Sequence, residues 1–399
     1  MSTPVTFLPS LFESFWLAGY ESACHVTRAG TRLDMLAATQ HDRFVDADYA
    51  RLADVRIATV RDTIRWHLVE AVPGVFDFSS VVPYAEAARA NDVQVIWDLL
   101  HYGVPDHVDV FGPEFVPRFA RFAAECARFV QAHGDGGVPF YTPVNEISFH
   151  CWAAGEVGWF HPFGHGRGAE LKRQLVRAWI AAVDEVRAVD ARARFVSVEP
   201  LIHVVPPKGE PDRDGQAAAT RESQFEAWDM IAGLREPQLG GAAHYLDVIG
   251  VNFYHDNQWE EPGGAKLHWH VRPRDERWLP LHVLLQEVHA RFQRPLLISE
   301  TSHVGVGRAE WIREITDEVA LAVAAGVPLE GICLYPILDR FEWDNPAHWH
   351  NSGLWDYAHE PDGTYTRVLN AEYAEELQRC QLRLAALGCG TVEPETVTA

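Results

Sequence analysis

Two apolar runs in the sequence each end abruptly in a glutamate. Residues 141–144 lead into Asn145 and Glu146, and residues 296–299 lead into Glu300. Short runs rich in aromatic or branched residues predict buried strands, so each carboxylate is expected at the rim of a sheet. Glycoside hydrolysis needs two carboxylates that converge on one bond, one to protonate the leaving oxygen and one to act at the anomeric carbon. The sequence therefore indicates Glu146 and Glu300 as a candidate catalytic pair.

A single glutamate at a strand end has more ordinary uses. It most often forms an ion pair or lies beside the N-terminus of a helix. Two such glutamates, each ending a strand of one repeating chain, favour catalysis over either ordinary role. Asn145 strengthens this interpretation, because an amide beside the acid can hydrogen-bond a sugar hydroxyl.

The bulk composition excludes several kinds of partner. The chain has 399 residues, of which 47% are hydrophobic, which is enough for one large core. Acidic residues outnumber basic residues 56 to 34, giving a formal net charge of −22. Nucleic acids and anionic membrane surfaces require a basic face, so neither is an expected partner. A small carbohydrate or glycoside is compatible with this charge, and the oligomeric state is left open.

The sequence also carries signals about location. No apolar run is long enough to span a membrane, and residues 1–10 lack the basic and apolar regions of a secretory signal. The cysteines are scattered without CxxC spacing, at Cys24, Cys126, Cys151, Cys333, Cys380 and Cys389. Several of them lie within apolar periods and are expected to be buried small hydrophobes. The predicted location is the cytoplasm.

Extended apolar runs alternate with helical periods along the whole chain. The predicted strands are residues 15–20, 57–61, 93–101, 140–146, 194–199, 247–254, 295–300 and 331–338. Strands buried on both faces, each followed by a helix with one apolar stripe, predict a parallel sheet covered by helices. Eight such units favour a closed (β/α)8 barrel over an open doubly wound sheet, since no nucleotide-binding glycine motif follows any strand. We predict a single α/β domain, a (β/α)8 TIM barrel with long strand-to-helix loops over residues 1–387, and a mobile tail at 388–399.

Short motifs resemble those of the family 1 glycoside hydrolases, in the family's order. Residues 61–66 (RDTIRW) resemble RFSxxW, 101–105 (HYGVP) resemble HWDLP, 142–146 (TPVNE) resemble TFNEP, 252–254 (NFY) resemble NYY, 298–300 (ISE) resemble ITENG, and 335–343 (YPILDRFEW) resemble WSLLDNFEW. The resemblance covers most of the chain. It implies a retaining β-glycosidase that acts on small β-linked glycosides through a glycosyl-enzyme, with the acids at the ends of the fourth and seventh strands.

The resemblance also implies a role for each matching residue. Glu146 is expected to be the general acid/base and Glu300 the nucleophile. Arg61 and Tyr254 are expected to contact Glu300. The residues expected to bind the sugar are Glu21, His101, Asn145, Asn252, Glu342 and Trp343. The retaining mechanism requires neither a metal nor another cofactor, so none is expected.

The chain departs from the family's pattern mostly around the expected sugar pocket. Glu21 stands where the family has Gln, Tyr102 and Tyr335 stand for Trp, Arg340 stands for Asn, Ile147 stands for Pro, and Thr301-Ser302 stand for Asn-Gly. We expect Glu21 to lie beside Glu342. The two carboxylates would then accept hydrogen bonds from the hydroxyl groups of one sugar, or favour a basic or amino-bearing ligand. Two roles stay open for Glu199, which ends the fifth predicted strand: a place in the site or a structural ion pair.

Other functions are compatible with parts of this pattern. A transglycosidase would pass the same intermediate to an alcohol, and an inactive sugar-binding barrel would not require both glutamates. A metal-dependent hydrolase is disfavoured, because the histidine pairs His161/His165, His268/His270 and His348/His350 lack a carboxylate or cysteine at ligand spacing. Tryptophans in the predicted loops either line aglycone subsites or pack the loops, and these include Trp152, Trp159, Trp259, Trp269, Trp343, Trp349 and Trp355.

Overall fold

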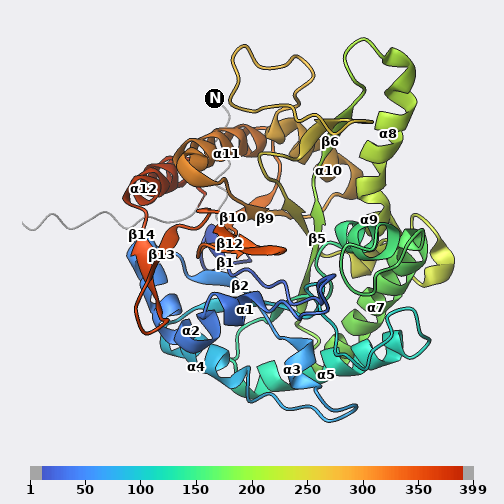
Figure 1. The fold of residues 1–399 in the computed structure, drawn as a ribbon, viewed down its shortest axis with the longest axis vertical. Helices are drawn as coiled ribbons and strands as arrows, with labels where there is room; N and C mark the ends of the chain where they lie inside the picture. The colour runs from blue at the N-terminus through green and yellow to red at the C-terminus, as the bar shows by residue number, and fades with distance from the viewer. Residues whose placement is uncertain (1–10, 390–399) are drawn as a thin grey trace, which may run out of the picture.

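Eight parallel strands close into a barrel in the computed structural model, which describes residues 11–389. The strands in order around the barrel are β1 (Trp16–Gly19), β2 (Thr59–Thr63), β3 (Gln94–Asp98), β4 (Phe140–Thr142), β5 (Arg194–Pro200), β7 (Val248–Asn252), β9 (Leu296–Thr301) and β10 (Leu329–Leu334), which pairs with β1 again. Each predicted run overlaps one of these strands, so the (β/α)8 prediction is confirmed. Figure 1 shows the barrel at the centre of a ring of helices.

The helices cover the outside of the barrel. They are α1 (Met35–Ala38), α2 (His41–Ala50), α3 (Trp66–Val69), α4 (Val82–Ala90), α5 (Phe115–His133), α6 (Ile147–His150), α7 (Gly168–Val189), α8 (Asp214–Glu222), α9 (Glu226–Ile231), α10 (Leu281–Phe292), α11 (Arg308–Ala324) and α12 (Ala371–Ala385). In α5, the buried residues include Phe115, Phe119, Phe122, Cys126 and Phe129. These side chains recur at helical spacing, so one face of the helix can pack against the barrel.

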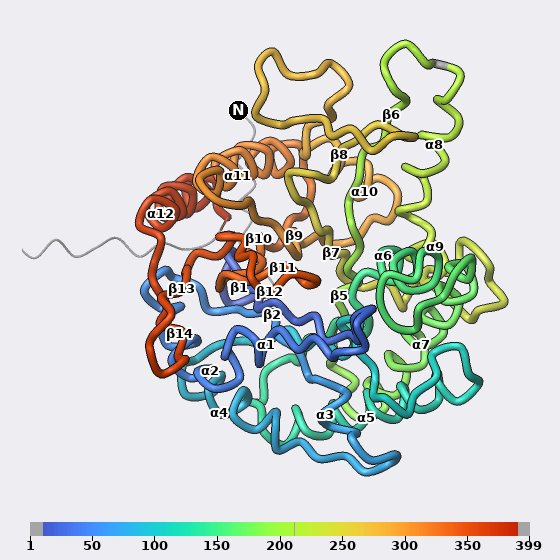
Figure 2. Tube along the Cα trace, in the orientation of Figure 1, coloured from blue at the N-terminus to red at the C-terminus, as the bar shows by residue number. Residues whose placement is uncertain are grey.

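The loops carry short strand pairs of their own. They are β6 (His203–Val205) with β8 (Gln258–Glu260), β11 (Phe341–Glu342) with β12 (Asn345–Trp349), and β13 (Trp355–His359) with β14 (Tyr365–Leu369). Figure 2 shows the segments around β6 and β8 projecting from one side of the barrel. No helix that the structure describes has the length and hydrophobicity that a membrane span requires.

Two apolar layers hold the barrel in shape. The inner layer fills the barrel and includes Leu17, Ile96, Val196 and Leu297, with Phe12 packed 5.0 Å from the ring of Phe140. The outer layer lies between the strands and the helices. Buried strands alternate side chains between these layers, so a polar residue in an inward position must find its partners inside the barrel.

The predicted tail lies mostly beyond the described residues. Cys389 is buried in the outer apolar layer. Residues 390–399 lie outside the part of the chain that the structure describes.

Candidate active site

Glu146 lies four residues beyond the end of β4 and immediately precedes α6. Its backbone adopts the left-handed conformation (φ 45°), its N–H donates to the Val198 carbonyl (3.0 Å), and its carbonyl accepts from the His150 N–H (2.8 Å). A non-glycine residue in this conformation carries about 1 kcal/mol or more of strain, which the surrounding structure must stabilise. The turn directs the carboxylate into the barrel mouth.

Two donors hold the Glu146 carboxylate. Asn252 Nδ2 donates to Oε1 (2.8 Å) and the Tyr102 hydroxyl donates to Oε2 (2.5 Å). Burial, followed by repulsion from the nearby Glu300 carboxylate, raises the pKa of Glu146 to about 8 despite these two bonds. Glu146 therefore holds a proton near neutral pH.

Glu300, near the end of β9, has a different setting. Arg61 Nη1 donates to its Oε1 (2.6 Å), and the Tyr254 hydroxyl donates to its Oε2 (2.8 Å). Bonds from a cation and a phenol stabilise the negative charge of the carboxylate. The two glutamates therefore have the unequal environments that an acid and a nucleophile require.

Arg61 is fully buried inside the barrel and is held by Asp98, which lies outside the motifs of the sequence. Its Nε and Nη2 donate to the two oxygens of Asp98 (3.0 and 2.7 Å). Burial alone would raise the pKa of Asp98, but Arg61 and His101 hold it below its usual range. Asp98 lies within a predicted strand that is buried on both faces. A charged residue at such a position must have a buried partner, and this is the feature of the sequence that could have indicated its role.

Asn145 and His101 complete the floor of the site. Asn145 Oδ1 accepts from Arg61 Nη2 (2.5 Å), and its Nδ2 donates to His101 Nε2 (3.2 Å). His101 Nδ1 in turn donates to Asp98 (3.0 Å). The two glutamates are also connected through Asn252, because the Ser299 hydroxyl beside Glu300 donates to Asn252 Oδ1 (2.7 Å).

The remaining predicted residues lie around this cluster. Glu21 is buried, and its carboxylate forms an ion pair with Arg340 (Nε to Oε2, 3.0 Å). Glu342 is exposed on the β11–β12 hairpin. Trp343 packs beside Tyr102, with ring centroids 5.7 Å apart. The structure thus groups the acids and their supports, places Glu21 and Trp343 beside them, and leaves Glu342 at the surface.

Glu199 supports the turn that carries Glu146. It is buried and accepts from the backbone N–H of Ser148 (2.9 Å), in the first turn of α6. Burial raises the pKa of Glu199 to about 7. This hydrogen bond fixes the start of α6, directly after Glu146. It is a structural contact with the backbone, and it was not among the two roles predicted for Glu199, a place in the site or a structural ion pair.

Aromatic rings form a layer beside Glu146. Tyr102 contacts Phe149, Phe160 and Trp343 at centroid distances of 5.4, 5.6 and 5.7 Å. Trp159 lies 5.7 Å from Trp343 and donates from Nε1 to Asp344 (2.7 Å). Of the predicted loop tryptophans, Trp159 and Trp343 therefore pack close to the site, whereas Trp152 is half-exposed.

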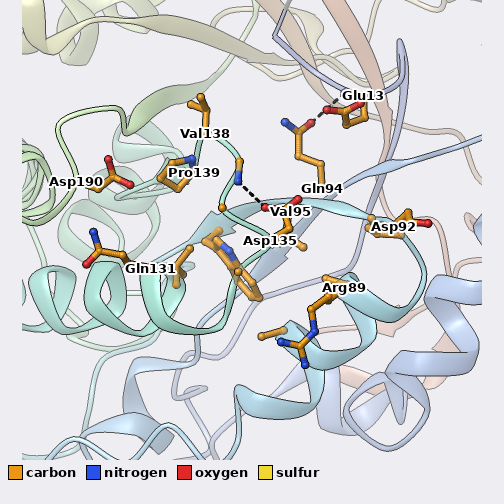
Figure 3. Close-up of a pocket in the computed structure, with 18 of the residues that line it drawn as sticks. Glu13, Arg89, Asp92, Gln94, Val95, Gln131, Asp135, Val138, Pro139 and Asp190 are labelled. Carbon is orange, nitrogen blue, oxygen red and sulfur yellow. Dashed lines mark hydrogen bonds between the residues drawn. The ribbon is translucent and has the colours of Figure 1, made fainter.

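A cavity of about 450 Å³ lies at the other end of the barrel. Figure 3 shows its lining, which includes Gln94 and Val95 at the start of β3 and Pro139 just before β4. His101 and Glu146 follow the opposite ends of these strands. The cavity is therefore separate from the carboxylate cluster.

Comparisons with known proteins give one kind of match. No protein-family model and no curated protein matches this sequence. The family 1 β-glucosidase from Thermotoga maritima superposes with a TM-score of 0.74 at 14% identity, covering 98% of this chain and 100% of its own. The chain has the fold of the family 1 β-glucosidases. The β-glucosidase from T. maritima in complex with castanospermine gives the same TM-score at 15% identity and the same coverage.

The family 1 β-glucosidase fold accounts for where the two glutamates lie. Glu146 follows the fourth barrel strand, and Glu300 lies on the seventh. In a parallel barrel the strand C-terminal ends all meet at one rim, where the loops build the site. Side chains separated by more than 150 residues are therefore brought together.

Proposed function

We propose that the protein is a retaining β-glycosidase that hydrolyses small β-linked glycosides, β-glucosides or near relatives. The observation that carries the proposal is the unequal pair at the barrel rim. Glu300 accepts from Arg61 and Tyr254, whereas Glu146 is buried with its pKa raised to about 8. The T. maritima β-glucosidase has been solved with deoxynojirimycin and with glucoimidazole, which supports a small carbohydrate as the ligand here.

The mechanism follows from these two settings. Glu300 attacks the anomeric carbon while Glu146 donates its proton to the departing glycosidic oxygen, giving a glycosyl-enzyme. Glu146, now a carboxylate, takes a proton from water as the water oxygen attacks the anomeric carbon. The bond to Glu300 breaks, its electron pair returns to the carboxylate, and the configuration is retained. No step requires a metal or another cofactor.

A panel of aryl β-glycosides, with the first-formed product anomer followed by proton NMR, tests the proposal. We expect cleavage of at least one β-glycoside with the β-anomer released first. Release of the α-anomer first, or the absence of cleavage of every glycoside in the panel, would contradict the proposal. A transglycosidase is the alternative, because the same glycosyl-enzyme can pass to an alcohol, and the aromatic rings packed around Tyr102 offer an apolar surface to such an acceptor. An added alcohol acceptor would then yield a β-linked transfer product in place of free sugar.

The pH dependence of kcat/KM is expected to report Glu146. The acid must hold its proton in the free enzyme, and the pKa of Glu146 is raised to about 8. Activity should therefore be kept below pH 8 and fall about tenfold per unit above it. If the fall of kcat/KM at high pH persists in Glu146→Gln, a group other than Glu146 causes it.

Glu21 and Arg340 are expected to set the preferred sugar. Glu21→Gln removes the carboxylate that compensates Arg340, leaving an unpaired cation beside Trp343. We expect kcat/KM for an aryl β-glucuronide to rise about tenfold relative to the β-glucoside, since a charge-assisted bond contributes about 1.5 kcal/mol. The double variant Glu21→Gln/Arg340→Asn is the matched control and should lose that gain. An unchanged ratio in Glu21→Gln would show that this pair does not control sugar choice.

The reducing cytoplasm is the proposed location. The six cysteines are all buried and unpaired, and unpaired thiols are typical of proteins in reducing compartments. Labelling of the cysteines in the native and unfolded protein purified from cells would test for the free thiols.

A further inference from the structure

Tyr102 lies on the tight turn that follows β3, in the left-handed conformation (φ 69°). The next residue, Gly103, packs so closely on Cys24 that a Cβ there would lie 2.3 Å from the Cys24 carbonyl oxygen. The Tyr102 ring is buried against Phe149, His150 and Trp343, among other rings. Backbone and ring packing together fix the position of the hydroxyl.

A chain of hydrogen bonds fixes the direction of the Tyr102 proton. Arginine only donates, so the amide oxygen of Asn145 must face Arg61 and its nitrogen must face away. That nitrogen donates to the Tyr102 hydroxyl oxygen (2.9 Å). The single proton of the hydroxyl is left to donate to Glu146 Oε2. The chain runs from Arg61 through Asn145 and Tyr102 to Glu146.

Each proposed catalytic glutamate thus has its own phenol. Tyr254 donates to Glu300, and Tyr102 donates to Glu146. A hydrogen-bond donor stabilises the ionised form of a carboxyl group. The bond from Tyr102 therefore opposes burial and the repulsion from Glu300, which both favour the protonated form of Glu146. Tyr335, the other phenol at the site, instead accepts from the Ser22 N–H (3.1 Å).

We propose that Tyr102 is a positioning residue that keeps Glu146 available as a carboxylate for the second half of the reaction. The inference rests on the proposed function. In the second half, Glu146 must accept a proton from the attacking water while Glu300 leaves the anomeric carbon. Tyr102 keeps its own proton throughout, and its donor bond holds Glu146 in the form and orientation that can accept.

The test is Tyr102→Phe, which keeps the ring and removes the donor. With a dinitrophenyl β-glycoside, whose departure needs no acid, kcat at pH 7 should fall about tenfold because deglycosylation becomes limiting. KM should fall in parallel, the acidic limb of kcat should move up by about one pH unit, and azide should restore turnover. Tyr84→Phe on α4 is the matched control, since the buried hydroxyl of Tyr84 has no hydrogen-bond partner within residues 11–389. The pH dependence of kcat in Tyr84→Phe should not change.

Two outcomes would overturn the inference. One is an equal fall of kcat and kcat/KM in Tyr102→Phe with no shift in the pH profile of kcat. A purely structural role of Tyr102 would give that result. The other is readable even if no glycoside is cleaved. In protein labelled with 13C-glutamate, the Glu146 carboxyl, assigned with Glu146→Gln, should titrate about one unit higher in Tyr102→Phe than in the unsubstituted protein; an unshifted titration would contradict the role of Tyr102 whatever the substrate is.

Discussion

Glu300→Ala is expected to lower kcat/KM by about 10⁵-fold or more, which corresponds to about 7 kcal/mol of transition-state stabilisation. The substitution removes the group that attacks the anomeric carbon. It also leaves Arg61 and Tyr254 directed at an empty space, since both donate to Glu300. Azide should bind there and attack from the same face as the lost carboxylate. The measurement is turnover of an aryl β-glycoside with and without azide, and the expected product is the α-glycosyl azide.

The control for this prediction is Glu300→Gln, which fills the space without the charge. It should be as inactive as Glu300→Ala but should not be rescued, because the amide occupies the site of the anion. Arg61 keeps its bidentate pair with Asp98 in both variants, so the thermal unfolding midpoint is expected to move little. A β-configured azide product from Glu300→Ala would show that Glu300 does not lie on the nucleophile's side of the sugar.

The barrel could be predicted from the sequence because its strands are buried on both faces. Such strands read as continuous apolar runs, and each was bounded by turn residues and followed by a helical period. The ends of the runs were less predictable. Residues 140–146 read as one strand, yet β4 stops at Thr142 and Glu146 adopts a left-handed turn. The loss of strand geometry there depends on contacts with β5 and α6, which a local pattern does not contain.

The candidate site residues were named from the sequence, together with the contacts of Arg61 and Tyr254 with Glu300 that the structure contains, but other pairings were not predicted. Asp98 supports Arg61, and Arg340 pairs with Glu21 across more than 300 residues of sequence. Pairings of this kind follow from barrel closure and side-chain direction, so spacing along the chain cannot reveal them. Glu342 illustrates the same limit, because its motif matched while the β11–β12 hairpin places it in solvent.

Glu146→Ala is expected to separate substrates by their leaving groups. General acid catalysis contributes about 10²–10⁴-fold, so kcat/KM for an alkyl β-glycoside should fall by about that factor. A dinitrophenolate leaves without a proton, and its kcat/KM should fall less than about tenfold. Deglycosylation then lacks its base, so the glycosyl-enzyme should accumulate as an initial burst. Azide should release it as the β-glycosyl azide, the opposite anomer from that expected with Glu300→Ala.

The matched control for Glu146 is Glu199→Gln. Glu199 is the neighbouring buried carboxyl group, its pKa is raised to about 7, and it contacts the Ser148 N–H at the start of α6. Its loss should lower activity equally for all leaving groups, because it acts on the position of Glu146 and not on the proton transfer. A leaving-group dependence in Glu199→Gln without one in Glu146→Ala would transfer the acid's role to Glu199. The same dependence in both would show that the two carboxyls share the proton, as adjacent groups with overlapping titrations do.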